Sequence, residues 1–224
     1  MKTQKNLIRI LMAIVTAVTP FVLLMLSVRL LITPSFAKLA YQLPGFPDDT
    51  YGFSAEDRLR WSEPSIKFLV NNEDISYLSA LAFEDGEPIF NARELSHMVD
   101  VKAVVTGMRV ALALLMIILL VVAMIAARND FTTNLLIAFH WGGWATVGFI
   151  VAILLFVTLN FNSLFGWFHK IFFESGTWQF DYSDSLIRLF PMRFWRDAFI
   201  FVGLLSLLFG GLVILATRRK AHFS

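Results

Sequence analysis

The chain alternates between long apolar stretches and shorter polar segments. Four of the apolar stretches contain no Asp, Glu, Lys or Arg. Each is close to or above the ~20 helical residues that cross a hydrocarbon core of ~30 Å. We therefore expect an all-α membrane protein with four transmembrane helices, at Ile10–Val28, Val110–Ala127, Leu135–Phe161 and Phe199–Thr217.

The longest polar segment, residues 33–103, mixes apolar with charged residues and contains helix-start signals. Ser54 and Asp57 have the spacing of a capping box. Pro64 suits the first turn of a helix. These signals favour a small, mainly helical cap on one side of the membrane over a disordered linker.

The cap is expected to end in a helix that continues into the second span. Asn91 with Glu94 forms another helix-start signal, and no residue between Arg93 and Ala127 breaks the pattern. The sequence therefore predicts one continuous helix that begins above the membrane. The chain is expected to divide into five segments. These are the N-terminal tail with the first span (1–32), the cap (33–103), the second and third spans (104–161), an aromatic-rich outer loop (162–198), and the fourth span with its tail (199–224).

Basic residues indicate the orientation in the membrane. They precede the first span, separate the second from the third and follow the fourth, at Lys2, Lys5, Arg9, Arg128, Arg218, Arg219 and Lys220. The positive-inside rule places these segments in the cytoplasm, together with His222 in the C-terminal tail. The cap and the loop 162–198 are then extracytoplasmic.

Composition restricts the chemistry. The chain of 224 residues is 57% hydrophobic and has no Cys, which excludes disulfides, thiolate metal sites and a Cys nucleophile on this chain. The formal net charge of +2 is too small to indicate a nucleic-acid partner.

Two of the four His are predicted to lie at the same outer interface. His97 comes about two helical turns before residue 104, where the segment that holds the second span begins, and His169 follows the third span within about two turns. Arg93, Glu94 and Asp100 fall at i−4, i−3 and i+3 from His97 and share its helix face. A carboxylate there could hold one ring nitrogen and raise its basicity.

Plainer interpretations fit each feature alone. An interfacial His is often a packing residue, and the aromatic stretch around His169 also fits a membrane-interface anchor. Glu94, His97, Asp100 and His169 are ligand types for a divalent metal, although no HExxH motif is present. A Ser nucleophile has no GxSxG motif to support it.

Four segments of the outer loops share a pattern with a known family: Phe90–Lys102, Phe168–Phe173, Gly176–Trp178 and Asp184–Pro191. In these segments the chain resembles the bacterial lipoprotein intramolecular transacylase family. The resemblance covers essentially the whole chain. It implies a cell-membrane acyltransferase that moves the sn-2 acyl chain of a diacylglyceryl lipoprotein to the α-amine of its N-terminal Cys, which gives the lyso form.

The resemblance also implies the site. His97 and His169 match the family's two catalytic His, with the membrane lipoprotein as the partner and no cofactor. We expect aromatic side chains to line a slot for the lipid, at Trp167, Phe168, Phe172 and Trp178. Arg93, Glu94, Asp100 and Asp184 are expected to support the site.

The reaction needs two proton transfers. The α-amine, with an ordinary pKa of ~7.7–8.0, must lose a proton to attack, and the departing glycerol oxygen must gain one. One His is expected to act as base and the other as acid. The nearby carboxylates favour His97 as the base, and the reverse assignment stays open.

Other functions remain compatible with the sequence. The same His pair would serve an intermolecular acyltransferase or a lipase that acts on outer-leaflet lipids. A non-enzymatic membrane binding module would tolerate changes of both His. Transport is disfavoured because the four spans lack charged residues.

Overall fold

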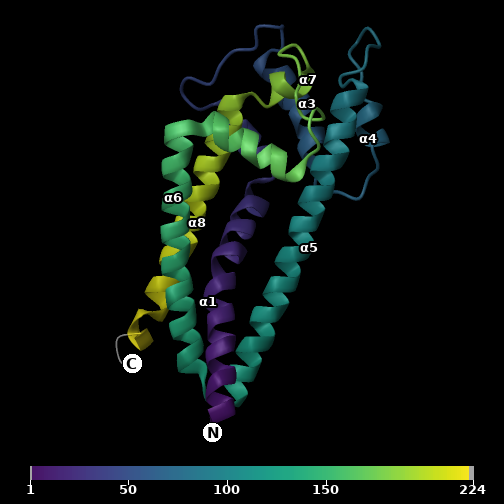
Figure 1. Ribbon diagram of the computed structural model, residues 1–224. Helices are drawn as coiled ribbons and strands as arrows, with labels where there is room; N and C mark the ends of the chain where they lie inside the picture. Colours follow the sequence, from purple (N-terminus) through teal and green to yellow (C-terminus); the bar gives the residue numbers. More distant parts are fainter. Residues whose placement is uncertain (1, 222–224) are drawn as a thin grey trace. The chain divides into compact units, whose positions relative to one another are not determined.

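The computed structural model of the protein describes residues 2–221, and His222 lies outside the described residues. Eight helices form this part of the chain, and one isolated β-bridge joins Ala82 to Pro88. Figure 1 shows the helices in chain order: α1 Lys2–Leu31, α2 Pro34–Tyr41, α3 Ala55–Phe68, α4 Ser76–Ser79, α5 Ala92–Arg128, α6 Thr132–Phe172, α7 Ser185–Leu189 and α8 Met192–Ala221.

Four of these helices are long and apolar enough to cross a membrane, namely α1, α5, α6 and α8. Each contains one of the predicted spans, so the prediction of a four-span, all-α protein is confirmed. The continuous helix from the cap into the second span is also confirmed, since α5 runs unbroken from Ala92 to Arg128.

The chain folds into two compact units. One unit holds residues 1–29, 109–156 and 201–224, and the other holds residues 30–108 and 157–200. The first is called the bundle unit here and the second the cap unit. Both histidines of interest belong to the cap unit.

Small residues allow the helices of the bundle unit to approach closely. A Cβ atom added at Gly142 of α6 would lie 2.6 Å from the Cβ atom of Thr19 in α1. Ser206 of α8 donates a hydrogen bond to the hydroxyl of Ser27 in α1, at 3.0 Å. Close backbone approach and interhelical hydrogen bonds are the usual means of helix association in lipid. Large apolar side chains such as Leu120 are exposed along the helix surfaces, as lipid contact requires.

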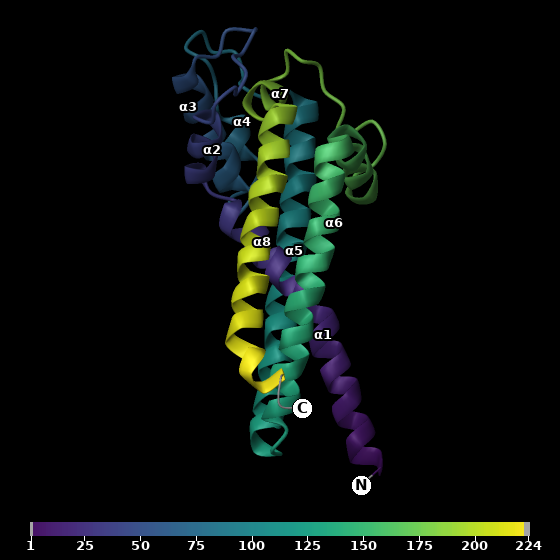
Figure 2. The ribbon, with the colours of Figure 1, turned by 90° about the vertical axis from the view of Figure 1, so that its left-hand side faces the viewer.

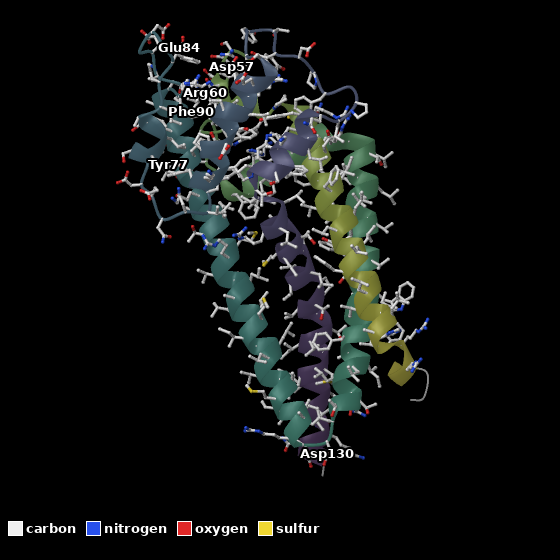
Figure 3. All side chains as sticks on the ribbon, turned by 180° about the vertical axis from the view of Figure 1, so that it is seen from behind. Asp57, Arg60, Tyr77, Glu84, Phe90 and Asp130 are labelled. Carbon is white, nitrogen blue, oxygen red and sulfur yellow. The ribbon has the colours of Figure 1, made fainter. Side chains whose placement is uncertain are left out.

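The short helices of the cap unit pack on one another. Helix α3 contacts α2, α4 and α7, and Figure 2 shows α2, α3 and α4 lying together. Polar side chains such as those of Asp57, Tyr77 and Glu84 lie on the outside of this group (Figure 3). The cap is therefore a packed structure with a hydrated surface.

The predicted capping box starts α3. Ser54 Oγ accepts a hydrogen bond from the N–H of Asp57 at 3.1 Å, and the carboxylate of Asp57 accepts one from the N–H of Ser54 at 2.9 Å. The placement of Pro64 in a first helical turn was wrong, because Pro64 lies inside α3. The helix has already begun ten residues earlier at Ser54, and its tertiary contacts outweigh the one backbone hydrogen bond that proline removes.

Candidate active site

The start of α5 fixes the position of His97. Asn91 Oδ1 accepts hydrogen bonds from the N–H groups of Arg93 and Glu94, at 3.0 and 3.1 Å. Glu94 returns a bond by accepting the N–H of Asn91 at 2.8 Å. These contacts satisfy N–H groups that have no partner inside the helix. The first turn is therefore well defined, and His97 follows on the next turn, buried with 8% of its surface exposed.

Glu94 also ties α5 to α7. Its second carboxylate oxygen accepts the backbone N–H of Leu186 at 2.7 Å, across 92 residues of sequence. The side chain is only 1% exposed. Each oxygen of Glu94 thus accepts a backbone N–H, and Glu94 does not hold Nδ1 of His97, which has no hydrogen-bond partner among the described residues.

The α6 helix carries His169 near its C-terminal end. Residue Asn160 of this helix has non-helical dihedral angles, φ −155° and ψ 68°, so α6 is kinked before the segment that holds His169. His169 Nδ1 lies 2.8 Å from the carbonyl oxygen of Phe165. A carbonyl only accepts, so Nδ1 carries the proton. In the neutral ring, Nε2 is then the atom with the free lone pair.

The two imidazoles lie close together in the cap unit. Their ring centroids are 6.2 Å apart, and the rings are within 19° of parallel. Each residue is 8% exposed. The predicted convergence of His97 and His169 thus occurs in the structure, in a setting with little water. Burial among apolar groups favours the uncharged form of an imidazole.

Aromatic rings surround the pair. Phe173 and Phe180 contact the ring of His97, with centroids 4.9 and 5.3 Å away. Phe165 and Trp178 contact the ring of His169, at 4.0 and 4.8 Å. Stiff aromatic side chains lose little conformational entropy when they hold a shape. They give the pair an apolar wall that fits a lipid ester better than a polar metabolite.

The expected slot residues divide into two groups. Trp178 contacts His169 as above, and Phe168 lies 5.6 Å from the same ring. Trp167 and Phe172 are 56% and 48% exposed, and the ring of Phe172 contacts that of Phe168 with centroids 4.8 Å apart. Their place in the slot stays a prediction.

Helical spacing identifies the residues that sequence reasoning missed. A step of two residues turns an α-helix by about 200°, which places Trp167 opposite His169. A step of four turns it by about 400°, which brings Phe165 and Phe173 to the face of His169. The i±4 rule was available from the sequence and would have selected these two rings. Phe180 had no such local signal.

Arg93 and Asp184 form a polar rim. Arg93 Nη2 lies 3.4 Å from a carboxylate oxygen of Asp184, and Asn91 donates to the other oxygen at 2.9 Å. Asp184 also accepts the N–H of Asp181 at 2.9 Å. The rim thus joins the start of α5 to the loop that carries Trp178. Through these contacts, Arg93 and Asp184 hold this loop against the start of α5.

The remaining supporting residue, Asp100, is half-buried one turn beyond His97. His97 Nδ1 is buried and has no hydrogen-bond partner among the described residues, so no carboxylate holds that atom. In the described part of the chain, no group of three or more His, Asp or Glu side chains has an arrangement that could hold a metal ion.

Comparison with known proteins places the chain in a family. The sequence model of the family described as lipoprotein intramolecular transacylase Lit matches residues 13–195. An uncharacterised protein of Aquifex aeolicus is 29% identical over 201 residues, which is 90% of each chain.

Solved structures of the membrane-integral lipoprotein intramolecular transacylase Lit from Bacillus cereus share the fold. One is 19% identical with a TM-score of 0.80 and covers 97% of each chain. A variant with one histidine replaced by arginine is 18% identical with a TM-score of 0.76, over 99% of this chain and 95% of that one.

The matched sequence and the multi-pass fold define the class of the protein: it is a membrane-embedded acyltransferase. More particularly, the chain belongs to the lipoprotein intramolecular transacylase Lit family. The family and enzyme class that the sequence predicted are therefore confirmed.

Proposed function

We propose that the protein moves the sn-2 acyl chain of a diacylglyceryl lipoprotein onto the α-amine of that lipoprotein's own N-terminal Cys. The observation that carries this proposal is the buried pair of imidazoles, 6.2 Å apart within an aromatic wall. Proton transfer near an apolar ester is the chemistry that such a pair serves best.

The geometry of the substrate explains the value of the wall. Attack of the amine on the sn-2 ester carbonyl closes a ring of eight atoms: the nitrogen, Cα, Cβ, the sulfur, two glycerol carbons, the ester oxygen and the carbonyl carbon. Flexible arms must be ordered before such a ring closes. An enzyme that holds the arms in a reactive geometry removes this entropy cost from the chemical step, where it can amount to several kcal/mol.

The tautomer of His169 favours this residue as the base. Its Nδ1–H is held by the Phe165 carbonyl at 2.8 Å, which leaves the Nε2 lone pair to accept the proton of the attacking amine. This is the reverse of the assignment that the neighbouring carboxylates favoured. Those carboxylates do not hold Nδ1 of His97, which weakens the reason for choosing His97 as the base.

The spacing of the rings limits the pair to one added proton. Two unit charges 6.2 Å apart repel by about 2.7 kcal/mol at an effective dielectric constant of ~20. Burial adds to this cost. A mechanism in which both rings are charged at once is therefore disfavoured.

One imidazole can serve both transfers. The amine nitrogen and the departing glycerol oxygen are bonded to the same carbon in the tetrahedral intermediate, so His169 Nε2 reaches both. His169 takes the proton from nitrogen and returns it to the leaving oxygen as the carbon–oxygen bond breaks, as one His does in serine hydrolases. His97 then acts as a neutral partner that hydrogen-bonds and orients the ester.

Substitution of each His tests the proposal. His97→Gln and His169→Gln are expressed in a host that lacks the activity, and lipoprotein N-termini are analysed by mass spectrometry. His140→Gln is the matched control, because His140 belongs to the bundle unit and hydrogen-bonds Thr217. We expect no lyso form from the two site variants and wild-type amounts from the control. Lyso-form product from His169→Gln would remove His169 from the mechanism.

The proposed orientation has both termini in the cytoplasm and the His pair outside it. The absence of native Cys allows a direct test with single cysteines. An impermeant maleimide should label Ser79→Cys in intact cells and Asn129→Cys only after permeabilisation. Labelling of Asn129→Cys in intact cells would contradict the orientation.

A further inference from the structure

Three buried side-chain nitrogen atoms lack a hydrogen-bond partner in the part of the chain that the structure describes. One is Arg58 Nε, whose guanidinium is bonded through another nitrogen to the Pro47 carbonyl. The other two are His97 Nδ1 and Trp178 Nε1, and both belong to the cluster around His169. A buried indole N–H without a partner costs free energy and needs an explanation.

Local structure holds Trp178 against the histidines. Gly176 has φ +92°, a left-handed conformation that glycine adopts without strain, and it lies in the turn before Trp178. Thr177 donates from its N–H and its hydroxyl to the carbonyl of Glu174, at 3.3 and 2.9 Å. The turn and the polar rim thus fix the segment from both ends. The indole ring lies 4.8 Å from the ring of His169, centroid to centroid.

The chemistry of the proposed reaction supplies the missing partner. Attack of the amine lone pair on the ester carbon pushes the carbonyl π electrons onto oxygen, which gains a negative charge. When the glycerol carbon–oxygen bond breaks, those electrons reform the carbonyl of the new amide, and the departing oxygen takes the proton from His169. The transient oxyanion therefore needs a donor that does not itself lose a proton. An indole N–H is such a donor, because it has no acceptor capacity and stays protonated.

On these grounds we infer that the Trp178 indole N–H donates a hydrogen bond to the oxyanion of the tetrahedral intermediate. The inference rests on the proposed acyl transfer and adds a catalytic residue to it. Trp178 was expected only as part of an apolar wall, a role that any large ring would fill. A donor role requires the N–H itself.

Two substitutions separate the donor from the ring. Trp178→Phe removes the N–H and part of the ring, whereas site-specific replacement of Trp178 by 3-benzothienylalanine keeps the bicyclic shape and exchanges N–H for sulfur. Trp141→Phe is the matched control, since Trp141 belongs to the bundle unit and is 60% exposed. The purified full-length protein is assayed in detergent with a synthetic diacylglyceryl lipopeptide.

The expected result is a loss of rate without a loss of substrate binding. Removing one oxyanion donor typically lowers kcat by about 100-fold or more. Both Trp178 variants should show such a decrease, with KM changed by less than about threefold, because the bond forms in the transition state only. Trp141→Phe should keep the wild-type rate.

A benzothienyl variant that keeps the wild-type kcat overturns the inference, even if Trp178→Phe is slow, because the ring alone would then suffice. An increase of KM at constant kcat overturns it as well. If the proposed function itself is wrong, the wild-type enzyme will move acyl chains between substrate molecules or not at all. Mass spectrometry of the wild-type products tests the proposed function, and the kinetics of the Trp178 variants test the inference.

Discussion

Glu94→Gln should destabilise the cap unit more than any change of an exposed charge. The wild-type carboxylate is 1% exposed and accepts the N–H groups of Asn91 and Leu186 at 2.8 and 2.7 Å. Gln has nearly the same shape but only one acceptor oxygen. Its amide NH₂ would face one of the two backbone donors, and that N–H would lose its partner.

The magnitude follows from these two bonds. A hydrogen bond to a charged group contributes about 1.5–3 kcal/mol, and an unpaired buried donor costs about 1–3 kcal/mol. Loss of one bond and weakening of the other should lower the free energy of unfolding by about 2–4 kcal/mol. The His pair should be affected too, because His97 is the next residue on the same face of α5. We therefore expect slower lyso-form production.

Thermal unfolding in detergent and hydrogen exchange of peptides that contain α7 measure the effect. Glu63→Gln is the control, since Glu63 pairs with Lys67 on an exposed surface where both side chains are 52% accessible. Such pairs contribute little. Equal stability and equal exchange of Leu186 in Glu94→Gln and Glu63→Gln would refute the reasoning.

Two further predictions concern the cap and the bundle separately. Burial raises the pKa of Asp49, but hydrogen bonds from Phe53 and Arg188 outweigh this effect and hold the pKa below its ordinary value of 3.8. The ionised Asp49 therefore stabilises the fold above pH 3.8, and this stabilisation is lost as the pH falls through the folded pKa. Asp49→Asn should lower the melting temperature at pH 7, and its difference from wild type should shrink below pH 4; a constant difference would contradict this. Gly142→Ala should lower the free energy of unfolding by about 1–3 kcal/mol through its clash with Thr19, measured by thermal unfolding. Gly148→Ala, with no atom within 4 Å of the added Cβ, should keep or raise the stability, because Ala favours a helix over Gly.

Local signals made much of the fold predictable. The four spans follow from uninterrupted apolar length, and the start of α3 follows from Ser54 and Asp57, which lie three residues apart. The convergence of His97 and His169 followed from counting turns to the same membrane interface. The spans and the start of α3 use only the spacing of residues along one helix, whereas the convergence also needs the orientation in the membrane.

Individual hydrogen bonds and ion pairs between distant segments were not predictable. The partner of Glu94 is the backbone of Leu186, 92 residues away, and an N–H group carries no signal in a sequence. Asp49 and Arg188, which form an ion pair at 3.0 Å, are separated by 139 residues. The protonated nitrogen of His169 also depends on a carbonyl position that only the folded helix defines. The proposed role of His169 as the base therefore depends on a contact that the sequence does not reveal.

The central claim is that the acyl chain never leaves its own substrate molecule. Two lipopeptides are mixed, one with a heavy sn-2 acyl chain on a light peptide and one with a light chain on a heavy peptide, and the products are analysed by mass spectrometry. Intramolecular transfer predicts lyso-form products in which every heavy chain stays on a light peptide. Heavy acyl chains distributed equally between heavy and light peptides would contradict the account.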